Sequence, residues 1–301
     1  MTVVASAPGK IVLSGEYAVL DGEPAVSMAI DRRAVVTLDD SPAGECRLLT
    51  PGFSGRDRYR IIDAVCGGSR PAKNIVMDTR ALAEGGKKIG IGSSAALTVA
   101  LVASLNASDE VLGEALLAHR ALQGGAGSGV DVATAVQGGL IEFEMSSQSV
   151  KSLYWPSGLS MRVIWTGVSS STEAKLEKLA ASATHRSRSA LLLAAARMAE
   201  AWRSGDAGRI LADYIPYIGV LRQFSVDHDL GIFDAGHDPL TDAAMLSDLV
   251  YKPAGAGGGD IGVLFGPDEA GLDAFIAGND NLVHGVLQCA LDPVGVRVLQ
   301  Q

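Results

Sequence analysis

The amino-acid sequence predicts an α+β fold in two domains. Its predicted strands and helices come in blocks instead of a strict strand–helix alternation, which favours α+β over a doubly wound sheet. The chain has 301 residues, enough for two ordinary domains. Hydrophobic residues make up 48% and charged residues 20%, the balance of a globular protein. We predict domains at residues 1–155 and 156–301.

The first predicted domain opens with short β-strands separated by Pro, Gly and Asp turn signals. These predicted strands are Val3–Ser6, Lys10–Leu13, Ala25–Ile30, Ala34–Leu38 and Asn74–Asp78. Each has alternating or continuous apolar residues and a length that suits a strand.

Helices follow in the same domain. One begins near Ser94 and is apolar almost all round, so we expect it to be buried. Ser108 is the predicted N-cap of the next helix, which ends near Leu122. A short helix at Val130–Val136 and a strand at Leu140–Glu144 come last.

The second predicted domain is mostly helical between two strands. The first strand is Met161–Thr166 and the last is Ile261–Phe265. The predicted helices between them are Ser187–Arg203, Ala207–Phe224 and Thr241–Val250.

Charge and targeting signals limit the classes of partner. The formal net charge is −9, which argues against a nucleic-acid or anionic-membrane surface. A polyanionic small molecule remains compatible, provided that backbone N–H groups, a few Lys or Arg and Mg²⁺ neutralise it locally. The first ten residues lack a basic segment followed by an apolar one, so we expect no signal peptide and a cytoplasmic location.

A glycine-rich segment at residues 87–96 has the features of an anion-binding loop. Gly90 and Gly92 allow close backbone approach, and the residues after them open a helix whose first N–H groups are exposed. Ser93 and Ser94 add hydroxyls. The pattern formally matches a dinucleotide fingerprint, but no buried strand directly precedes it. A turn that only begins a buried helix is the plainer alternative.

Three further segments have a similar character. Residues 7–20 place Lys10 beside a predicted tight turn at Gly9. Residues 127–133 place Asp131 at a helix start, and residues 252–260 form a flexible glycine-rich loop. Each alone has a structural explanation, namely a surface lysine, a first-turn carboxylate and a helix C-cap. Four such segments in one chain favour a ligand site.

Together the four segments resemble the motifs of GHMP kinases, in that superfamily's order. The pattern P-G-K-x-x-L-x-G-E-Y/H lies at residues 8–17, G-x-G-S-S-A-A at residues 90–96 and G-A-G-G-G-D at residues 255–260. The resemblance implies a ribosomal S5 domain 2-like N-terminal half and a ferredoxin-like C-terminal half.

Within the superfamily, several details resemble phosphomevalonate kinases. They are Tyr17 where mevalonate kinases usually have His, Gln123-Gly124 followed by residues 127–133, residues 165–172 (W-T-G-V-S-S-S-T), and Lys252-Pro253 before the glycines. Two features depart from the pattern. His119 and Arg120 lie near the place of a Mg²⁺-binding Glu in mevalonate kinases, and the chain is short.

The resemblance implies ATP and Mg²⁺ as cofactors and assigns roles to named residues. The implied catalytic residues are Lys10 and Asp131, and Ser94 is the implied metal ligand. The implied nucleotide-binding residues are Gly90, Gly92, Ser93, Ser94 and Ala95. The implied substrate-binding residues are Tyr17, Arg120, Ser128, Ser170, Lys252, Ala256, Gly257 and Gly258. Cations that could meet an acceptor phosphate are Lys10, Lys88, His119, Arg120 and Lys252.

The implied activity is ATP-dependent phosphorylation of 5-phosphomevalonate to 5-diphosphomevalonate in isoprenoid biosynthesis. The alternatives are an alcohol-phosphorylating kinase of the superfamily, mevalonate kinase first, a decarboxylase that phosphorylates its substrate transiently, and a nucleotide-binding regulator without catalysis. We expect a small phosphorylated substrate, no nucleic-acid or membrane partner, and leave a homodimer open.

Overall fold

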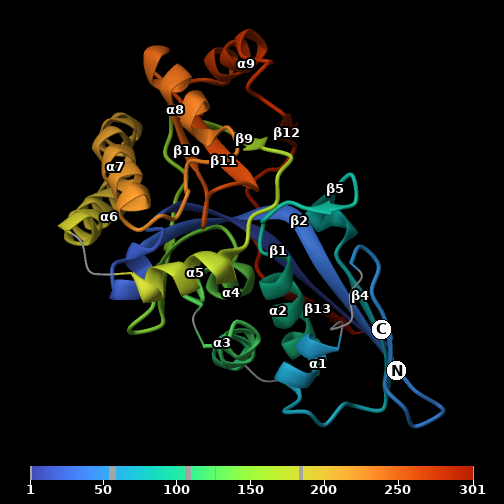
Figure 1. Cartoon of the computed structure of the whole chain (residues 1–301). Helices are drawn as coiled ribbons and strands as arrows, with labels where there is room; N and C mark the ends of the chain where they lie inside the picture. Colours follow the sequence, from blue (N-terminus) through green and yellow to red (C-terminus); the bar gives the residue numbers. More distant parts are fainter. Residues whose placement is uncertain (1, 54–58, 106–109, 126, 183–185, 301) are drawn as a thin grey trace. The chain divides into compact units, whose positions relative to one another are not determined.

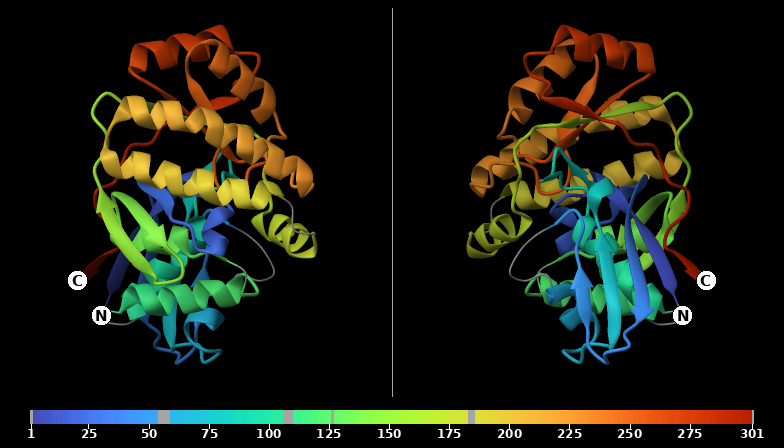
Figure 2. Two further views of the ribbon diagram at one scale, coloured as in Figure 1. Left: turned by 90° about the vertical axis from the view of Figure 1, so that its left-hand side faces the viewer. Right: turned by 90° about the vertical axis from the view of Figure 1, so that its right-hand side faces the viewer.

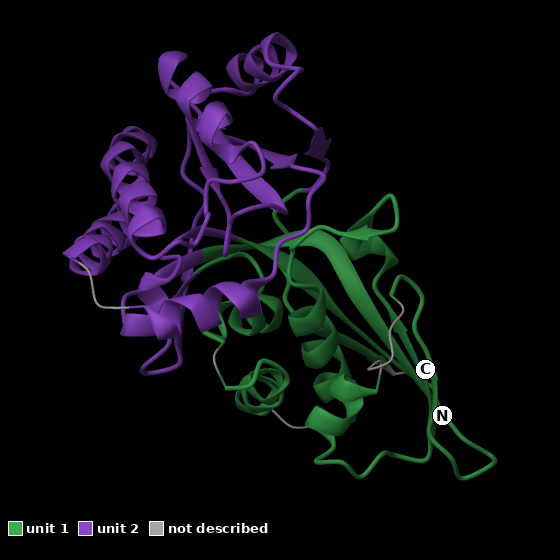
Figure 3. Ribbon diagram, in the orientation of Figure 1, with its two compact units in different colours: residues 1–11, 27–141, 290–301 green, residues 12–26, 142–289 purple. Residues whose placement is uncertain are grey.

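The computed structural model describes residues 2–53, 59–105, 110–125, 127–182 and 186–300. The chain forms two compact units, and each unit is discontinuous in sequence (Figure 3). Unit 1 contains residues 1–11, 27–141 and 290–301, and unit 2 contains residues 12–26 and 142–289. The predicted domain boundary at residue 155 stays a prediction. The compact units are divided differently, because residues 12–26 belong to unit 2 and residues 290–301 belong to unit 1.

A twisted β-sheet forms the framework of unit 1. Its strands follow the order β13-β1-β2-β4-β3, and β7 also pairs with β2. The bounds are β1 Val3–Ser14, β2 Ala25–Asp40, β3 Arg47–Leu49, β4 Lys73–Asp78, β7 Leu140–Glu144 and β13 Arg297–Gln300. Strand β13 pairs antiparallel with β1, so the two chain ends lie side by side (Figures 1 and 2).

The first strand is longer than predicted. The structure replaces the predicted strands Val3–Ser6 and Lys10–Leu13 with the continuous strand β1. Pro8 lacks an N–H donor, and it lies beyond Val3–Ser6, the residues of β1 that pair with β13. Gly9 makes no turn there. A Cβ on Gly9 would lie 2.8 Å from the Ile91 carbonyl oxygen, so its role is close packing.

The second strand is also continuous, which corrects the predicted pair Ala25–Ile30 and Ala34–Leu38. Its middle contains three charged residues, 31–33. In the structure each charge has a partner. Asp31 accepts a hydrogen bond from the Ala290 N–H at 2.8 Å, and Arg32 pairs with Glu84 at 2.9 Å.

Four helices pack together in unit 1, on one face of the sheet (Figure 2). They are α1 Arg60–Val65, α2 Ser93–Leu105, α3 Val111–Leu122 and α4 Val130–Gln137. The short elements η2 Arg80–Leu82, β5 Ala83–Glu84 and β6 Lys87–Lys88 precede α2. Helix α2 contacts α1, α3, α4 and β13, and residues Ala95–Ser104 are buried, as predicted. The predicted cap Ser108 lies outside the described residues.

Unit 2 has a ferredoxin-like core. Its antiparallel sheet has the order β10-β11-β9-β12, and long helices separate β9 from β10, whereas α9 separates β11 from β12. The strands are β8 Ser149–Leu153, which pairs with β7, β9 Ser160–Trp165, β10 Val250–Pro253, β11 Ile261–Gly266 and β12 Gly285–Leu287. This topology confirms the ferredoxin-like half that the sequence resemblance implied.

The helices of unit 2 are η1 Ala18–Asp21, α5 Thr172–Ala181, α6 Arg186–Ser204, α7 Ala207–Asp227, α8 His237–Leu246 and α9 Glu269–Gly278. Helices α6 and α7 confirm two predicted helices, whereas η1, α5 and α9 were not predicted. Helices α6 and α7 lie side by side (Figures 1 and 2). The predicted helix Thr241–Val250 is wrong at both ends, because α8 starts earlier and Val250 begins β10. None of the described helices has both the length and the apolar composition that a membrane span needs.

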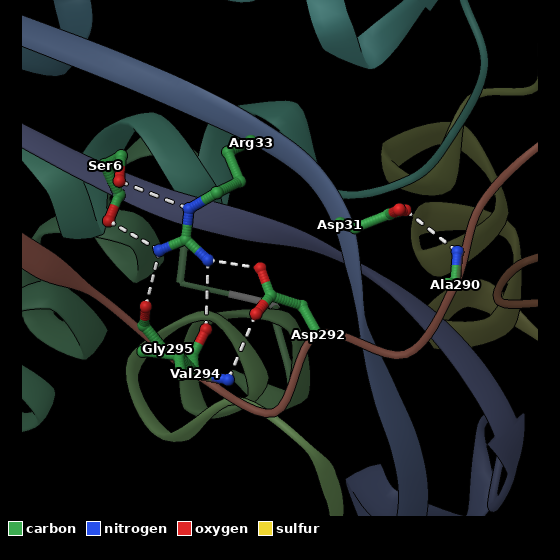
Figure 4. Close-up of polar contacts among 7 residues, drawn as sticks. All are labelled: Ser6, Asp31, Arg33, Ala290, Asp292, Val294 and Gly295. Carbon is green, nitrogen blue, oxygen red and sulfur yellow. Dashed lines mark hydrogen bonds and ion pairs between the residues drawn. The ribbon is translucent and has the colours of Figure 1, made fainter.

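Arg33 makes several contacts with the C-terminal segment of unit 1 (Figure 4). The Arg33 guanidinium pairs with Asp292 and donates to the carbonyl oxygens of Val294 and Gly295. On its other side it donates to the hydroxyl and the carbonyl oxygen of Ser6. A planar fork with five donors suits this set of acceptors. Arg33 thus joins β1, β2 and the returning chain end.

We expect Arg33→Lys to lower the free energy of unfolding by about 2 kcal/mol, because an ammonium keeps the charge but leaves buried acceptors without donors. Urea unfolding measures this effect. The control is Arg47→Lys on exposed β3, for which we expect a change within about 0.5 kcal/mol. Equal effects of the two substitutions would contradict the clamp.

Candidate active site

The glycine-rich loop before α2 has the geometry of an anion-binding loop. Gly90 and Gly92 adopt φ angles of 74° and 82°, in the left-handed region that favours glycine. Helix α2 begins at Ser93, and its first N–H groups have no acceptor within the helix. These groups and the helix dipole favour a phosphate at this end of α2.

Lys10 lies against this loop. Its backbone N–H donates to the Ile91 carbonyl oxygen at 2.9 Å, so β1 and the loop are in direct contact. A Cβ on Gly92 would lie 3.0 Å from the Lys10 Cγ. Gly92 therefore gives the Lys10 side chain room to pass the start of α2. The structure brings the predicted catalytic lysine and the predicted nucleotide-binding residues together.

Ser94, His119 and Asp131 form a polar row across α2, α3 and α4. The Ser94 Oγ lies 3.1 Å from His119 Nε2, and His119 Nδ1 lies 4.0 Å from Asp131 Oδ1. His119 is 1% exposed, whereas the Asp131 side chain is 18% exposed. Asp131 also accepts from the Val132 N–H at 3.1 Å. The two predicted functional groups therefore face opposite sides of one buried imidazole.

Arg120 and Ser128 lie in the same unit, next to these residues in sequence. Arg120 is in the last turn of α3, half-buried, and its Nε has no hydrogen-bond partner among the described residues. The Ser128 Oγ accepts a long hydrogen bond, 3.4 Å, from the Val130 N–H at the start of α4. Their contact with an acceptor stays a prediction.

The other predicted substrate residues belong to unit 2. Tyr17 is a buried tyrosine with a φ of 61°, a strained conformation for an aromatic residue. Its hydroxyl donates to the Ala256 carbonyl oxygen at 2.7 Å, and its ring packs on Phe224. Burial raises the pKa of the Tyr17 hydroxyl. Tyr17 thus stays a neutral donor that fixes the glycine-rich loop.

The loop at residues 254–259 is held in place, which corrects the expectation of a flexible loop. Besides the bond from Tyr17, the Ser170 Oγ donates to the Gly257 carbonyl oxygen at 2.7 Å. The Gly258 N–H donates to the Ile232 carbonyl oxygen at 2.7 Å. Consecutive anchors of this kind fix the backbone of Ala256, Gly257 and Gly258.

A buried histidine adds a further anchor to the loop. His237 Nε2 is 3.0 Å from the Gly259 carbonyl oxygen, which can only accept, so Nε2 carries the proton. Nδ1 then accepts from the Tyr251 hydroxyl at 2.8 Å. Burial lowers the pKa of His237 to about 4, so the ring is neutral at pH 7.

Lys252, a predicted substrate-binding residue, is buried in an ion pair. Its side chain is 0% exposed and pairs with Glu16, whose side chain is 2% exposed. Burial lowers the pKa of the Lys252 ammonium, and the Glu16 carboxylate opposes that shift. Tyr217 donates to the other Glu16 oxygen at 2.7 Å and accepts from the Gly15 N–H at 3.0 Å. The Lys252 ammonium is enclosed in unit 2, and the Glu16 carboxylate balances its charge. It is therefore not available to an acceptor from solution in this structure.

Lys175 is a charged residue near the loop that the motif analysis missed. Its Nζ donates to the carbonyl oxygens of Leu230 and Gly231. A Cβ on Gly258 would lie 2.4 Å from this Nζ. Burial lowers the pKa of the ammonium, and Asp234 partly opposes the shift. The signal in the sequence is weak, because a lysine one turn into a helix is ordinary.

The described residues contain no cluster of three or more His, Cys, Asp or Glu that could enclose a metal ion. A Mg²⁺ ion bound with a nucleotide takes most of its ligands from phosphates and water, and one or two from protein. The Ser94 hydroxyl, with Asp131 across the imidazole of His119, fits that limited requirement. Ser94 would hold the ion, which would neutralise phosphate charge.

Comparisons with known proteins show which family the chain belongs to. No family model matches the chain. The phosphomevalonate kinase of Streptomyces sp. strain CL190 is 30% identical over 97% of this chain and 97% of its own length. The mevalonate kinase of Thermococcus sibiricus is 30% identical over 89% of this chain and 90% of its own.

A solved structure extends the similarity to the fold. Streptococcus pneumoniae phosphomevalonate kinase, in complex with phosphomevalonate and AMPPNP, superposes with a TM-score of 0.80 at 19% identity, covering 96% of this chain and 99% of the other. Fold and relatives define an ATP-dependent small-molecule kinase. The chain belongs to the GHMP kinase superfamily, among its mevalonate-pathway kinases.

We expect Lys252→Met to destabilise the protein by ~3–5 kcal/mol, because it leaves the buried Glu16 carboxylate without its counter-charge. Adding Glu16→Gln should recover part of that loss, since the amide carries no charge. Chemical denaturation of the two single variants and the double variant measures both effects.

The exposed pair of Lys178 with Asp229 gives the control. Lys178→Met should change stability by less than about 1 kcal/mol. A cost of Lys252→Met as small as that of Lys178→Met, or a double variant worse than the sum of the singles, would contradict a buried ion pair.

Proposed function

We propose that this kinase transfers the γ-phosphoryl group of ATP to 5-phosphomevalonate and forms 5-diphosphomevalonate. The observation that carries the proposal is the similarity to the Streptomyces phosphomevalonate kinase over 97% of both chains. The sequence features at Tyr17 and at residues 127–133 and 165–172 favour the same acceptor.

The residues of unit 1 divide the work of phosphoryl transfer, which depends on positioning and charge neutralisation. The loop at Gly90–Ala95 and the start of α2 bind the ATP phosphates. Ser94 would hold Mg²⁺, which would supply positive charge to the phosphates. Lys10, held beside the loop through Gly92, neutralises charge on the transferring group.

The acceptor determines what Asp131 must do. A phosphate monoester has a second pKa near ~6 and is mostly dianionic at pH 7, so it needs no strong base. Asp131 would then orient the acceptor and the neighbouring cations. An alcohol acceptor would need a positioned base instead.

In unit 2 the fixed backbone of Ala256, Gly257 and Gly258 is the proposed acceptor contact, and Tyr17 and Ser170 hold that backbone. Arg120, Ser128 and Lys175 are further candidates for a phosphorylated acceptor. Lys252 is left out because Glu16 neutralises it. Cytoplasmic location and a homodimer remain predictions.

Mevalonate kinase is the second candidate function, favoured by the 30% identity with the Thermococcus enzyme over 89% of this chain. The decisive experiment is ADP release with Mg-ATP in the presence of mevalonate, 5-phosphomevalonate, homoserine or galactose. We expect turnover with 5-phosphomevalonate alone and no release of CO₂. Turnover with mevalonate alone would overturn the substrate assignment, and ATP binding without turnover would support a regulator.

We expect Asp131→Asn to lower kcat with 5-phosphomevalonate by roughly ten- to a thousandfold, less than the loss of a general base in an alcohol kinase, because the acceptor is already ionised. Steady-state kinetics with 5-phosphomevalonate and ATP binding by calorimetry provide the measurement. A loss of about four orders of magnitude or more with intact ATP binding would contradict an orienting role.

A further inference from the structure

His119 is a buried polar side chain that the proposed mechanism does not use. It lies in the last turn of α3 and is 1% exposed. Its two ring nitrogens face two different functional groups, Ser94 on α2 and Asp131 on α4.

The positions of the neighbours decide which nitrogen carries the proton. Asp131 Oδ1 lies 4.0 Å from Nδ1, too far for a direct hydrogen bond but near enough for its negative charge to favour a proton on Nδ1. A neutral imidazole then has a bare Nε2, which accepts a hydrogen bond. The Ser94 Oγ, 3.1 Å away, is the donor that meets it.

This arrangement sets the direction of the Ser94 hydroxyl. A serine oxygen has one proton and two lone pairs. If the proton is directed to His119, both lone pairs point elsewhere, and one of them is available to a cation. With the opposite tautomer, Nε2–H would occupy a lone pair of Oγ and turn the serine proton away from the imidazole.

We infer that His119 is a positioning residue that turns the Ser94 hydroxyl so that its oxygen can bind the nucleotide-associated Mg²⁺, and that Asp131 fixes the tautomer needed for this. The inference rests on the proposed role of Ser94. Groups that orient a metal ligand in this way commonly change metal affinity by about 10- to 100-fold when they are removed.

The test measures ADP binding by calorimetry with Mg²⁺ and with EDTA, without any acceptor. The ratio of the two dissociation constants gives the Mg²⁺ contribution. We expect Ser94→Ala and His119→Leu each to reduce this ratio about tenfold or more, with little change in EDTA. His119→Gln, whose amide oxygen can accept from Ser94, should retain most of the ratio.

A double-variant cycle separates this role from a packing role. Because His119 acts through Ser94, the variant with both Ser94→Ala and His119→Leu should be no worse than Ser94→Ala alone. Ser104→Ala is the matched control, since this buried serine of α2 donates to the Leu101 carbonyl oxygen within its own helix and should leave the ratio unchanged. An unchanged ratio in His119→Leu, or multiplicative losses in the double variant, would overturn the inference.

A second measurement needs no variant that might unfold. Nitrogen-15 NMR of the wild-type imidazole should find Nδ1 protonated and Nε2 bare, and the opposite tautomer would refute the proposed orientation. Failure of the proposed function is a separate result, because it would show as lack of turnover with 5-phosphomevalonate while the ADP measurements stand.

Discussion

The buried ion pair of Glu16 and Lys252 sets the arrangement of unit 2. Both side chains are almost completely enclosed, and each would be costly to bury alone. Glu16 also receives the Tyr217 hydroxyl, which in turn accepts from the Gly15 N–H. The pair therefore fixes the strained turn that presents Tyr17. Through Tyr17 it also fixes the glycine-rich loop that follows β10.

In unit 1 close packing, and not charge, brings the functional groups together. Glycine at positions 9 and 92 removes the Cβ atoms that would otherwise separate β1 from the loop before α2. The lysine of β1 can then lie beside the helix start. On the other side of α2, the buried His119 connects Ser94 to Asp131. The candidate site thus depends on small residues on one side and on one imidazole on the other.

Much of the fold could be predicted from the sequence because local signals agreed with tertiary packing. The apolar helix α2 and the strand β11 are examples, since their patterns allow only a buried position. The strand predictions failed where residues distant in sequence supply hydrogen-bond and ion-pair partners to charged side chains. The sequence predicted two strands on either side of residues 31–33, yet these residues lie within β2, where Asp31 and Arg33 bind residues 290–295.

The sequence by itself determined the order of the four motifs and the positions of their glycines. It also determined the chemical types of Lys10, Ser94 and Asp131. These features depend on residue type and local backbone freedom, which are readable along the chain. The tertiary structure decided which of the candidate cations can bind a ligand. Lys252 has the sequence context of a ligand-binding lysine, but it is buried against Glu16, from the far end of the chain. His119 looked like one cation among several, and only the packing of three helices places it between Ser94 and Asp131.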